Sequence, residues 1–130
     1  PNGANDVILT NTPIYQTSYL GRYYYPTSGG LLRRLLDVGS RTAPAATLYH
    51  FTTATDQTKE TTSTVDIGYH YVATDANGIP IDTDSDALPD YLEDGNGNGA
   101  VNSGETNWND PSDFGLRVII TEPKRAANLP

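Results

Sequence analysis

Short stretches of β-branched and aromatic residues, separated by polar turns, predict a small and mostly β domain. The two clearest are residues 47–54 (TLYHFTTA) and 64–74 (TVDIGYHYVAT). The polar segment between them has the length of a hairpin loop, so we expect antiparallel pairing that brings Tyr49-His50-Phe51 near Tyr69-His70-Tyr71 and stacks their aromatic rings. Weaker strand predictions fall at residues 6–10, 15–20, 22–25 and 115–121.

Helical spacing is rare, which predicts at most one or two short helices. Leu31/Leu35 and Leu32/Leu36 recur at i, i+4 before a Gly-containing stop at residues 37–39. A second helical turn is expected at residues 89–93, and Asn77-Gly78 predicts a tight turn. The expected architecture is a small antiparallel or mixed sheet.

Length and composition indicate one domain, residues 1–130, with linker-like termini at 1–5 and 124–130. Cys is absent, which excludes disulfides and zinc ribbons, and no apolar run approaches the ~20 residues of a membrane span. The net charge of −8 argues against a nucleic-acid partner, because phosphate binding needs a basic face. It favours divalent cations as partners.

The segment 82–93 (DTDSDALPDYLE) has the spacing of a calcium-binding loop. Loops of EF-hand type carry oxygen ligands at positions 1, 3, 5, 7, 9 and 12, with a backbone carbonyl at 7 and a bidentate Glu at 12. In this segment those positions hold Asp82, Asp84, Asp86, the Leu88 carbonyl, Asp90 and Glu93. Position 6 is usually Gly because the turn needs a positive φ; here it is Ala87, at a cost of about 1 kcal/mol.

A second loop follows at once in residues 94–105 (DGNGNGAVNSGE) and has Gly99 at position 6. Its ligand positions hold Asp94, Asn96, Asn98, the Ala100 carbonyl, Asn102 and Glu105. A solvated Asp/Gly/Asn-rich linker is the plain alternative. Two consecutive matches in one register favour two metal sites instead, and the numerous, flexible oxygen ligands favour Ca²⁺ over Mg²⁺.

The spacing of the two loops indicates a structural role for the ion. Glu93 and Asp94 are adjacent, which leaves no room for the paired helices of an EF-hand switch. The chain also has no Met to line a switchable groove. Without disulfides, a small extracellular domain needs another staple, and calcium can provide it.

Taken together, the run 64–71 (TVDIGYHY) and the two acidic loops resemble a calcium-binding module of large secreted β-helix-type surface proteins of environmental bacteria. The loops themselves are similar to thrombospondin type 3 and dockerin calcium repeats, and the resemblance covers roughly residues 47 to 123. It implies calcium-stabilised surface structure and no enzymatic activity, with the side-chain ligands at the positions named above. Ala87 departs from the Gly usual in such loops.

Other polar and aromatic residues could carry chemistry, but a purely structural role explains each of them more simply. His50 and His70 could form a metal or acid–base pair across the strands, and Asp66 could be a general base. Each is more simply a strand residue. Asp110 and Asp113 are expected to cap a turn rather than complete a third ion site. Trp108 and Tyr23 to Tyr25 could stack on sugars, but core or interface packing is the plainer reading.

The combined expectation is a non-enzymatic, extracellular or cell-surface structural protein. The first hypothesis is a subunit of a self-assembling filament, in which the segment 6–10 is donated to a neighbouring copy. The alternative is a stalk or cap module of a larger adhesin, joined to neighbouring domains and possibly touching carbohydrate. The Thr-rich stretch 52–64 adds possible O-glycosylation.

Overall fold

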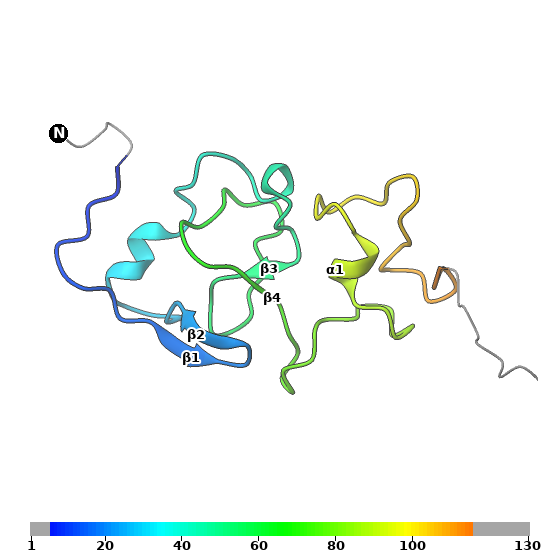
Figure 1. Cartoon of the computed structure of the whole chain (residues 1–130), viewed down its shortest axis with the longest axis horizontal. Helices are drawn as coiled ribbons and strands as arrows, with labels where there is room; N and C mark the ends of the chain where they lie inside the picture. Colours follow the sequence, from blue (N-terminus) through cyan, green and yellow to red (C-terminus); the bar gives the residue numbers. More distant parts are fainter. Residues whose placement is uncertain (1–5, 116–130) are drawn as a thin grey trace, which may run out of the picture.

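Residues 6–115 are described by the structure, a computed structural model of the chain, and their regular elements are few and short (Figure 1). The small antiparallel sheets and scarce helical residues confirm a small, mostly β domain. In chain order the elements are β1 (Gln16–Ser18), β2 (Gly21–Tyr24), the 3₁₀ turns η1 (Leu31–Leu35) and η2 (Pro44–Ala46), β3 (Phe51–Thr52), β4 (Tyr71–Val72) and α1 (Asp90–Glu93). The predicted closing strand 115–121, apart from its first residue, and the linker-like termini lie outside the described residues.

The first sheet is the β1–β2 hairpin, which confirms the two β-prone pieces at 15–20 and 22–25. Its strands pair antiparallel, with Gln16 opposite Tyr24 and Ser18 opposite Gly21. Gly21, which lies between the two predicted pieces, is the first residue of β2. The ring of Tyr71 packs so closely there that a Cβ on this residue would lie 2.3 Å from the Tyr71 hydroxyl oxygen.

The second sheet pairs β3 with β4 antiparallel, as predicted, but each strand has two residues rather than the eight or more expected. The flanking backbone groups bond elsewhere: Tyr25 donates to the Thr53 carbonyl, and Val65 donates to the Arg41 carbonyl. The predicted stacking between the two aromatic tripeptides is also wrong. Tyr71 stacks instead on Tyr24 of the first hairpin, with ring centroids 4.2 Å apart and planes at 10°.

The N-terminal segment 6–10 is irregular, so the predicted strand there is wrong. Val7 and Leu9 pack against a small cluster made by Tyr25, Leu32 and Leu35, and Arg34 Nη1 donates to the Ile8 carbonyl at 2.9 Å. The predicted helix forms as η1, a 3₁₀ turn. Its buried residues, Leu32 and Leu35, are therefore spaced i, i+3, which share a face in a 3₁₀ helix.

The turn predicted at Asn77-Gly78 is present, with Gly78 at φ 79° and a bridge between Thr74 and Pro80 closing it. The β1–β2 hairpin lies at one end of the molecule, and α1 with the two acidic loops lies at the other (Figure 1). The loops therefore stand apart from the aromatic stack of the hairpin and contact the rest of the chain through residues such as Tyr49, His50 and Lys59.

The Tyr24–Tyr71 stack should contribute more stability than any exposed tyrosine of the same hairpin. Tyr24 is fully buried, whereas its neighbour Tyr23 is 57% exposed. Tyr24→Ala should lower the free energy of unfolding by about 3–5 kcal/mol, and the matched change Tyr23→Ala by about 1.5 kcal/mol or less. Urea denaturation measures both, and equal losses would contradict the packing described here.

Candidate metal centre

The backbone of the first acidic loop curls around the carboxylate of its first residue. Asp82 Oδ1 accepts the N–H of Ser85 at 2.7 Å, and Asp82 Oδ2 accepts the N–H of Ala87 at 3.0 Å. Ser85 and Ala87 have positive φ values of 65° and 79°. Ala87 thus adopts the left-handed backbone that the sequence predicted, without the Gly that would favour it.

The second loop has the same backbone conformation at the matching positions. Gly97 and Gly99 have φ values of 65° and 77°, and Asp94 Oδ2 accepts the N–H of Gly99 at 2.7 Å. Two loops with different residues therefore place a carboxylate under the same turn. Only glycine makes this turn without strain, so the first loop is the more strained of the two.

The inner side chains of the loops follow a shared register too. In the first loop, the N–H groups of Asp86 and Leu88 donate to the carboxylates of Asp84 and Asp86 at 3.2 and 2.7 Å. In the second, the N–H groups of Asn98 and Ala100 donate to the side-chain oxygens of Asn96 and Asn98 at 3.0 and 2.8 Å. Each bond leaves further lone pairs of the side-chain oxygens directed into the loop.

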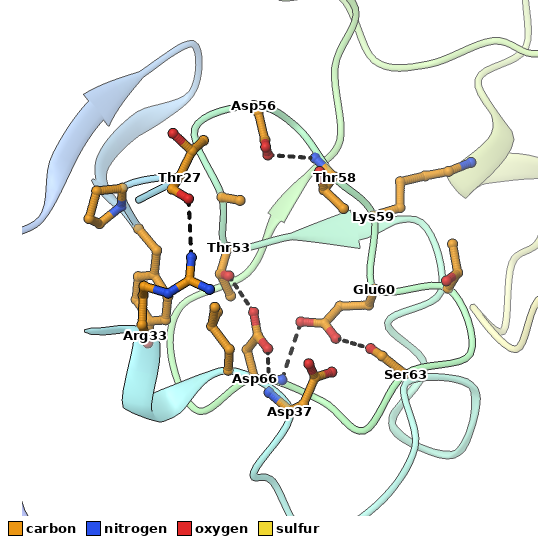
Figure 2. A pocket seen from close by; sticks show the side chains of 15 residues that line it. Thr27, Arg33, Asp37, Thr53, Asp56, Thr58, Lys59, Glu60, Ser63 and Asp66 are labelled. Atoms are coloured by element: carbon orange, nitrogen blue, oxygen red, sulfur yellow. Dashed lines mark hydrogen bonds between the residues drawn. The ribbon is translucent and has the colours of Figure 1, made fainter. Parts of the chain in front are cut away.

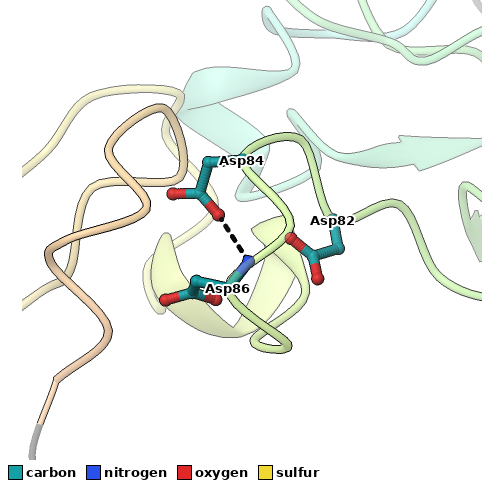
Figure 3. A group of neighbouring side chains, drawn as sticks. All are labelled: Asp82, Asp84 and Asp86. Atoms are coloured by element: carbon teal, nitrogen blue, oxygen red, sulfur yellow. Dashed lines mark hydrogen bonds between the residues drawn. The ribbon is translucent and has the colours of Figure 1, made fainter.

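Three aspartates of the first loop form a cluster that could hold a metal ion. Asp82, Asp84 and Asp86 each offer an oxygen, and these oxygens lie within 4.8 Å of one another (Figure 3). One oxygen each of Asp84 and Asp86, Oδ2, is buried with no hydrogen-bond partner among residues 6–115. Carboxylate oxygens in that situation are costly unless a cation or water satisfies them.

Glu93, the last ligand position of the first loop, is the most unusual carboxylate of the described chain. It is 2% exposed, and neither Oε1 nor Oε2 has a hydrogen-bond partner of good geometry within residues 6–115. Burial raises the pKa of Glu93 to about 7; the Thr106 side chain opposes this rise, and the charges of Asp84 and Asp86 add to it. Loss of solvent likewise raises the pKa of Asp84, with the charges of Asp86 and Asp82 contributing.

Asp90, at position 9, lies outside the aspartate cluster. Its carboxylate accepts the N–H and the hydroxyl of Thr83, both at 2.7 Å, and lies 3.4 Å from Lys59 Nζ. These contacts fix the start of α1, whose last residue is Glu93. In loops of this type, position 9 often reaches the ion through a water molecule, so its distance from the cluster is compatible with a ligand role.

The polar side chains of the second loop converge on one another. The amide groups of Asn96 and Asn98 each lie 2.7 Å from the amide of Asn102. Glu105 accepts the N–H groups of Asn96 and Asn102 at 3.0 and 2.9 Å. The predicted ligands are therefore together, but protein donors already satisfy much of their oxygen surface, so this loop is the weaker candidate.

The two histidines do not pair. His70 Nε2 lies 2.8 Å from Glu60 Oε1, whereas His50 Nε2 lies 3.1 Å from Asp94 Oδ2. Burial, followed by the nearby Lys59 charge, lowers the pKa of His50 and favours its neutral form. The link from His50 to a predicted loop ligand was missed in the sequence, because the two residues are 44 positions apart and no local pattern connects them.

Glu60 and Asp66 line a pocket of about 370 Å³ next to η1 (Figure 2). Asp66 accepts the Thr53 hydroxyl at 2.5 Å and the Asp37 N–H at 2.8 Å, and Glu60 accepts the Ser63 hydroxyl at 2.7 Å. Burial raises the pKa of Asp66. Burial also opposes ionisation of Glu60, but hydrogen bonds from His70 and Ser63 hold its pKa below the usual value. These carboxylates are held within the fold.

Of the remaining candidates, Asp110 caps a turn, as predicted, by accepting the N–H and the hydroxyl of Ser112. Trp108 is buried and packs on His50, with ring centroids 5.2 Å apart. Tyr24 and Tyr25 are buried as well, which leaves Tyr23 as the exposed member of the predicted stacking residues.

Comparison with known proteins gives no relative: no protein-family model, no curated protein and no solved structure matches this chain. Within residues 6–115, no helix has the length and apolar character needed to cross a membrane.

Ala87→Gly should relieve the strain of the first loop. Removing the Cβ at φ 79° should raise the free energy of unfolding by about 0.5–1 kcal/mol, after the greater freedom of the unfolded chain is subtracted. The matched change Ala76→Gly, at an exposed turn residue without a positive φ, should lower it by about 0.4–1 kcal/mol. Urea denaturation measures both changes in the free energy of unfolding. Two changes of the same sign would contradict backbone strain at Ala87.

Proposed function

We propose that this chain is a non-enzymatic, calcium-stabilised structural protein of the cell surface or extracellular space. The observation that carries the proposal is Glu93, a buried carboxylate whose two oxygens lack hydrogen-bond partners of good geometry in the described chain and which lies near enough to Asp84 and Asp86 for their charges to raise its pKa. A bidentate Glu at the end of such a loop is the usual complement to three preceding carboxylates. A bound divalent cation would satisfy all of these oxygens together.

Calcium suits the donors better than the alternatives. The ligand set is entirely oxygen, and the side chains come from flexible loops that can supply six to eight ligands, whereas Mg²⁺ demands a rigid octahedron. The first loop, with five carboxylates at its ligand positions, is proposed as the tighter site. The second loop, with three neutral amides, is proposed as the weaker one.

A structural rather than catalytic role is supported by how the other buried acids are used. Glu60 accepts hydrogen bonds from Ser63, His70 and a backbone N–H group. Asp66 accepts hydrogen bonds from Thr53 and a backbone N–H group. Each is thereby committed to holding the loop 53–70 together. We therefore propose no enzymatic activity for the pocket that they line.

For the partner, we propose further copies of the same chain in a surface filament. In the single chain, Val7 and Leu9 cover the cluster of Tyr25, Leu32 and Leu35. An exchange of this segment between copies would place it on the same cluster of a neighbour, as in domain swapping, and a non-closing series of such exchanges gives a filament.

The second candidate is a stalk or cap module of a larger surface adhesin with a carbohydrate contact. It is favoured by a row of exposed tyrosines on the hairpin side: Tyr23 is 57% exposed and lies 5.6 Å from Tyr15 and 6.5 Å from Tyr69 between ring centroids. Exposed aromatic rings of this kind can stack on sugars or on protein.

Calcium removal should destabilise the protein. At a hundred times its dissociation constant, a bound ion adds about 2.7 kcal/mol per site, so EGTA should lower the Tm by roughly 5–15 °C per site. Glu93→Gln should remove most of the first site's share. In EGTA this variant should be at least as stable as the wild type, because its amide carries no charge to bury.

Differential scanning calorimetry with and without calcium measures these shifts. Asp113→Asn, which removes one negative charge from an exposed position, is the control and should keep the full calcium response. An unchanged Tm after EGTA treatment, in protein shown beforehand to be calcium-loaded, would contradict the structural role of the ion.

Assembly should depend on the N-terminal segment. Purified chain at high concentration with calcium should form filaments visible by negative-stain microscopy, and removal of residues 1–10 should abolish them while leaving the calcium-dependent Tm shift in place. A full-length chain that stays strictly monomeric in analytical ultracentrifugation, or a truncated chain that still polymerises, would rule out exchange of this segment. The first result would favour the stalk module.

A further inference from the structure

His50 lies within hydrogen-bonding distance of a ligand position of the second acidic loop and close to a ligand position of the first. Its ring is buried, with Nε2 3.1 Å from Oδ2 of Asp94, the first residue of the second loop. On the other side, Nδ1 lies 3.7 Å from Oδ2 of Asp90, position 9 of the first loop. One side chain from outside both loops therefore sits between them.

The chemistry of Asp94 assigns the proton on this ring. An ionised carboxylate only accepts, so Nε2 of His50 carries the hydrogen and donates to Asp94. Asp94 then has three donors: His50 and the Gly99 N–H on Oδ2, and the Asn98 N–H on Oδ1. A carboxylate has about four lone-pair positions, so the one left for a cation is on Oδ1. His50 thus helps to select which oxygen of Asp94 faces into the loop.

The ring of His50 cannot easily turn away from this position. Trp108 and Tyr49 meet it edge-on, with centroids 5.2 and 4.9 Å from its own. Tyr49 in turn donates its N–H to the Gly97 carbonyl at 3.1 Å, and its ring lies so close to Gly99 that a Cβ there would be 2.2 Å from Cδ2. The second loop is therefore packed against the same residues that hold the histidine.

In the first loop, Asp90, whose carboxylate lies 3.7 Å from His50 Nδ1, is held by contacts of its own. Asp90 donates its N–H to the Ile81 carbonyl at 2.9 Å, and its carboxylate is shared by Thr83 and Lys59. Glu93 and Asp94 are adjacent in the chain. A movement of α1 that re-aims Glu93 must therefore also move Asp94 and its bond to His50.

We propose that His50 is a positioning residue that makes the two loops one coupled calcium-binding unit, so that an ion in either loop raises the affinity of the other. This rests on the proposed calcium function and names its regulation. Residues that orient ligating carboxylates typically contribute about 10–100-fold to metal affinity. Coupling between two sites is reciprocal, so the effect must appear in both loops.

Two substitutions of His50 distinguish the effect of its hydrogen bond to Asp94 from the effect of its packing. In His50→Gln the amide nitrogen falls near the place of Nε2 and can still donate to Asp94. In His50→Asn it falls near Nδ1 and cannot. Calorimetric titration with CaCl₂ should show two coupled sites in the wild type. His50→Asn should weaken the second site about 10–100-fold and abolish positive cooperativity, and His50→Gln should stay near the wild type.

His70 provides the matched control, because it is also a mostly buried histidine bonded to a carboxylate, but away from the loops. His70→Asn should lower the Tm without changing either calcium affinity or the cooperativity. Trp108, the single Trp of the chain, packs on His50, and its fluorescence during the wild-type titration reports changes around this histidine.

The positioning role of His50 is wrong if His50→Asn binds calcium with wild-type affinities and cooperativity. It is also wrong if His50→Asn and His50→Gln weaken calcium binding equally. In both cases the proposed calcium function stands. If the wild-type chain itself binds no calcium, the first titration shows this before any variant is compared, and both proposals fail together.

Discussion

The arrangement of this protein depends on negative charge gathered within twelve residues of its chain. Five carboxylates fall in the segment 82–93, and the backbone turns of that segment gather three of them, Asp82, Asp84 and Asp86, within 4.8 Å of one another. Repulsion and desolvation oppose this arrangement, as the raised pKa of Glu93 shows. A divalent cation would reverse the balance, because it would convert unsatisfied oxygens into ligands. The proposed role of calcium follows from that single electrostatic constraint.

The rest of the chain supplies the frame against which the loops are held. The β sheets are very small, so stability depends on specific side-chain contacts, such as the Tyr24–Tyr71 stack between the two sheets and the packing of Tyr49, His50 and Trp108 beside the acidic loops. β3 directly follows Tyr49 and His50, and Phe51 meets Tyr91 of α1 edge-on at 6.5 Å. Ordering of the loops by an ion would therefore stabilise their contacts with Tyr49, His50 and Phe51.

The parts predicted correctly from the sequence are those in which the determining residues are close together in the chain. The positions of Asp82, Asp84 and Asp86 predicted their cluster, Ala87 its positive φ, and residues 89–93 the turn of helix that became α1. The extent of the strands could not be predicted, because the backbone groups of 47–54 and 64–74 pair with residues near 25, 35, 41 and 97. The contact of His50 with Asp94 could not be predicted either, because the two residues are 44 positions apart in the chain. The segment 6–10 has the composition of a strand but packs side chains instead of pairing its backbone.

The most direct test is the position of the ion itself. Crystals grown with calcium, and the anomalous scattering of the bound metal, should place an ion with oxygens of Asp84, Asp86 and Glu93 at about 2.3–2.6 Å. Both Glu93 oxygens should coordinate it, which would explain why a buried carboxylate lacks hydrogen-bond partners of good geometry in the described chain. An ion that binds elsewhere, or a structure at millimolar calcium in which Glu93 turns to a protein or water partner and no ion is present, would contradict the account.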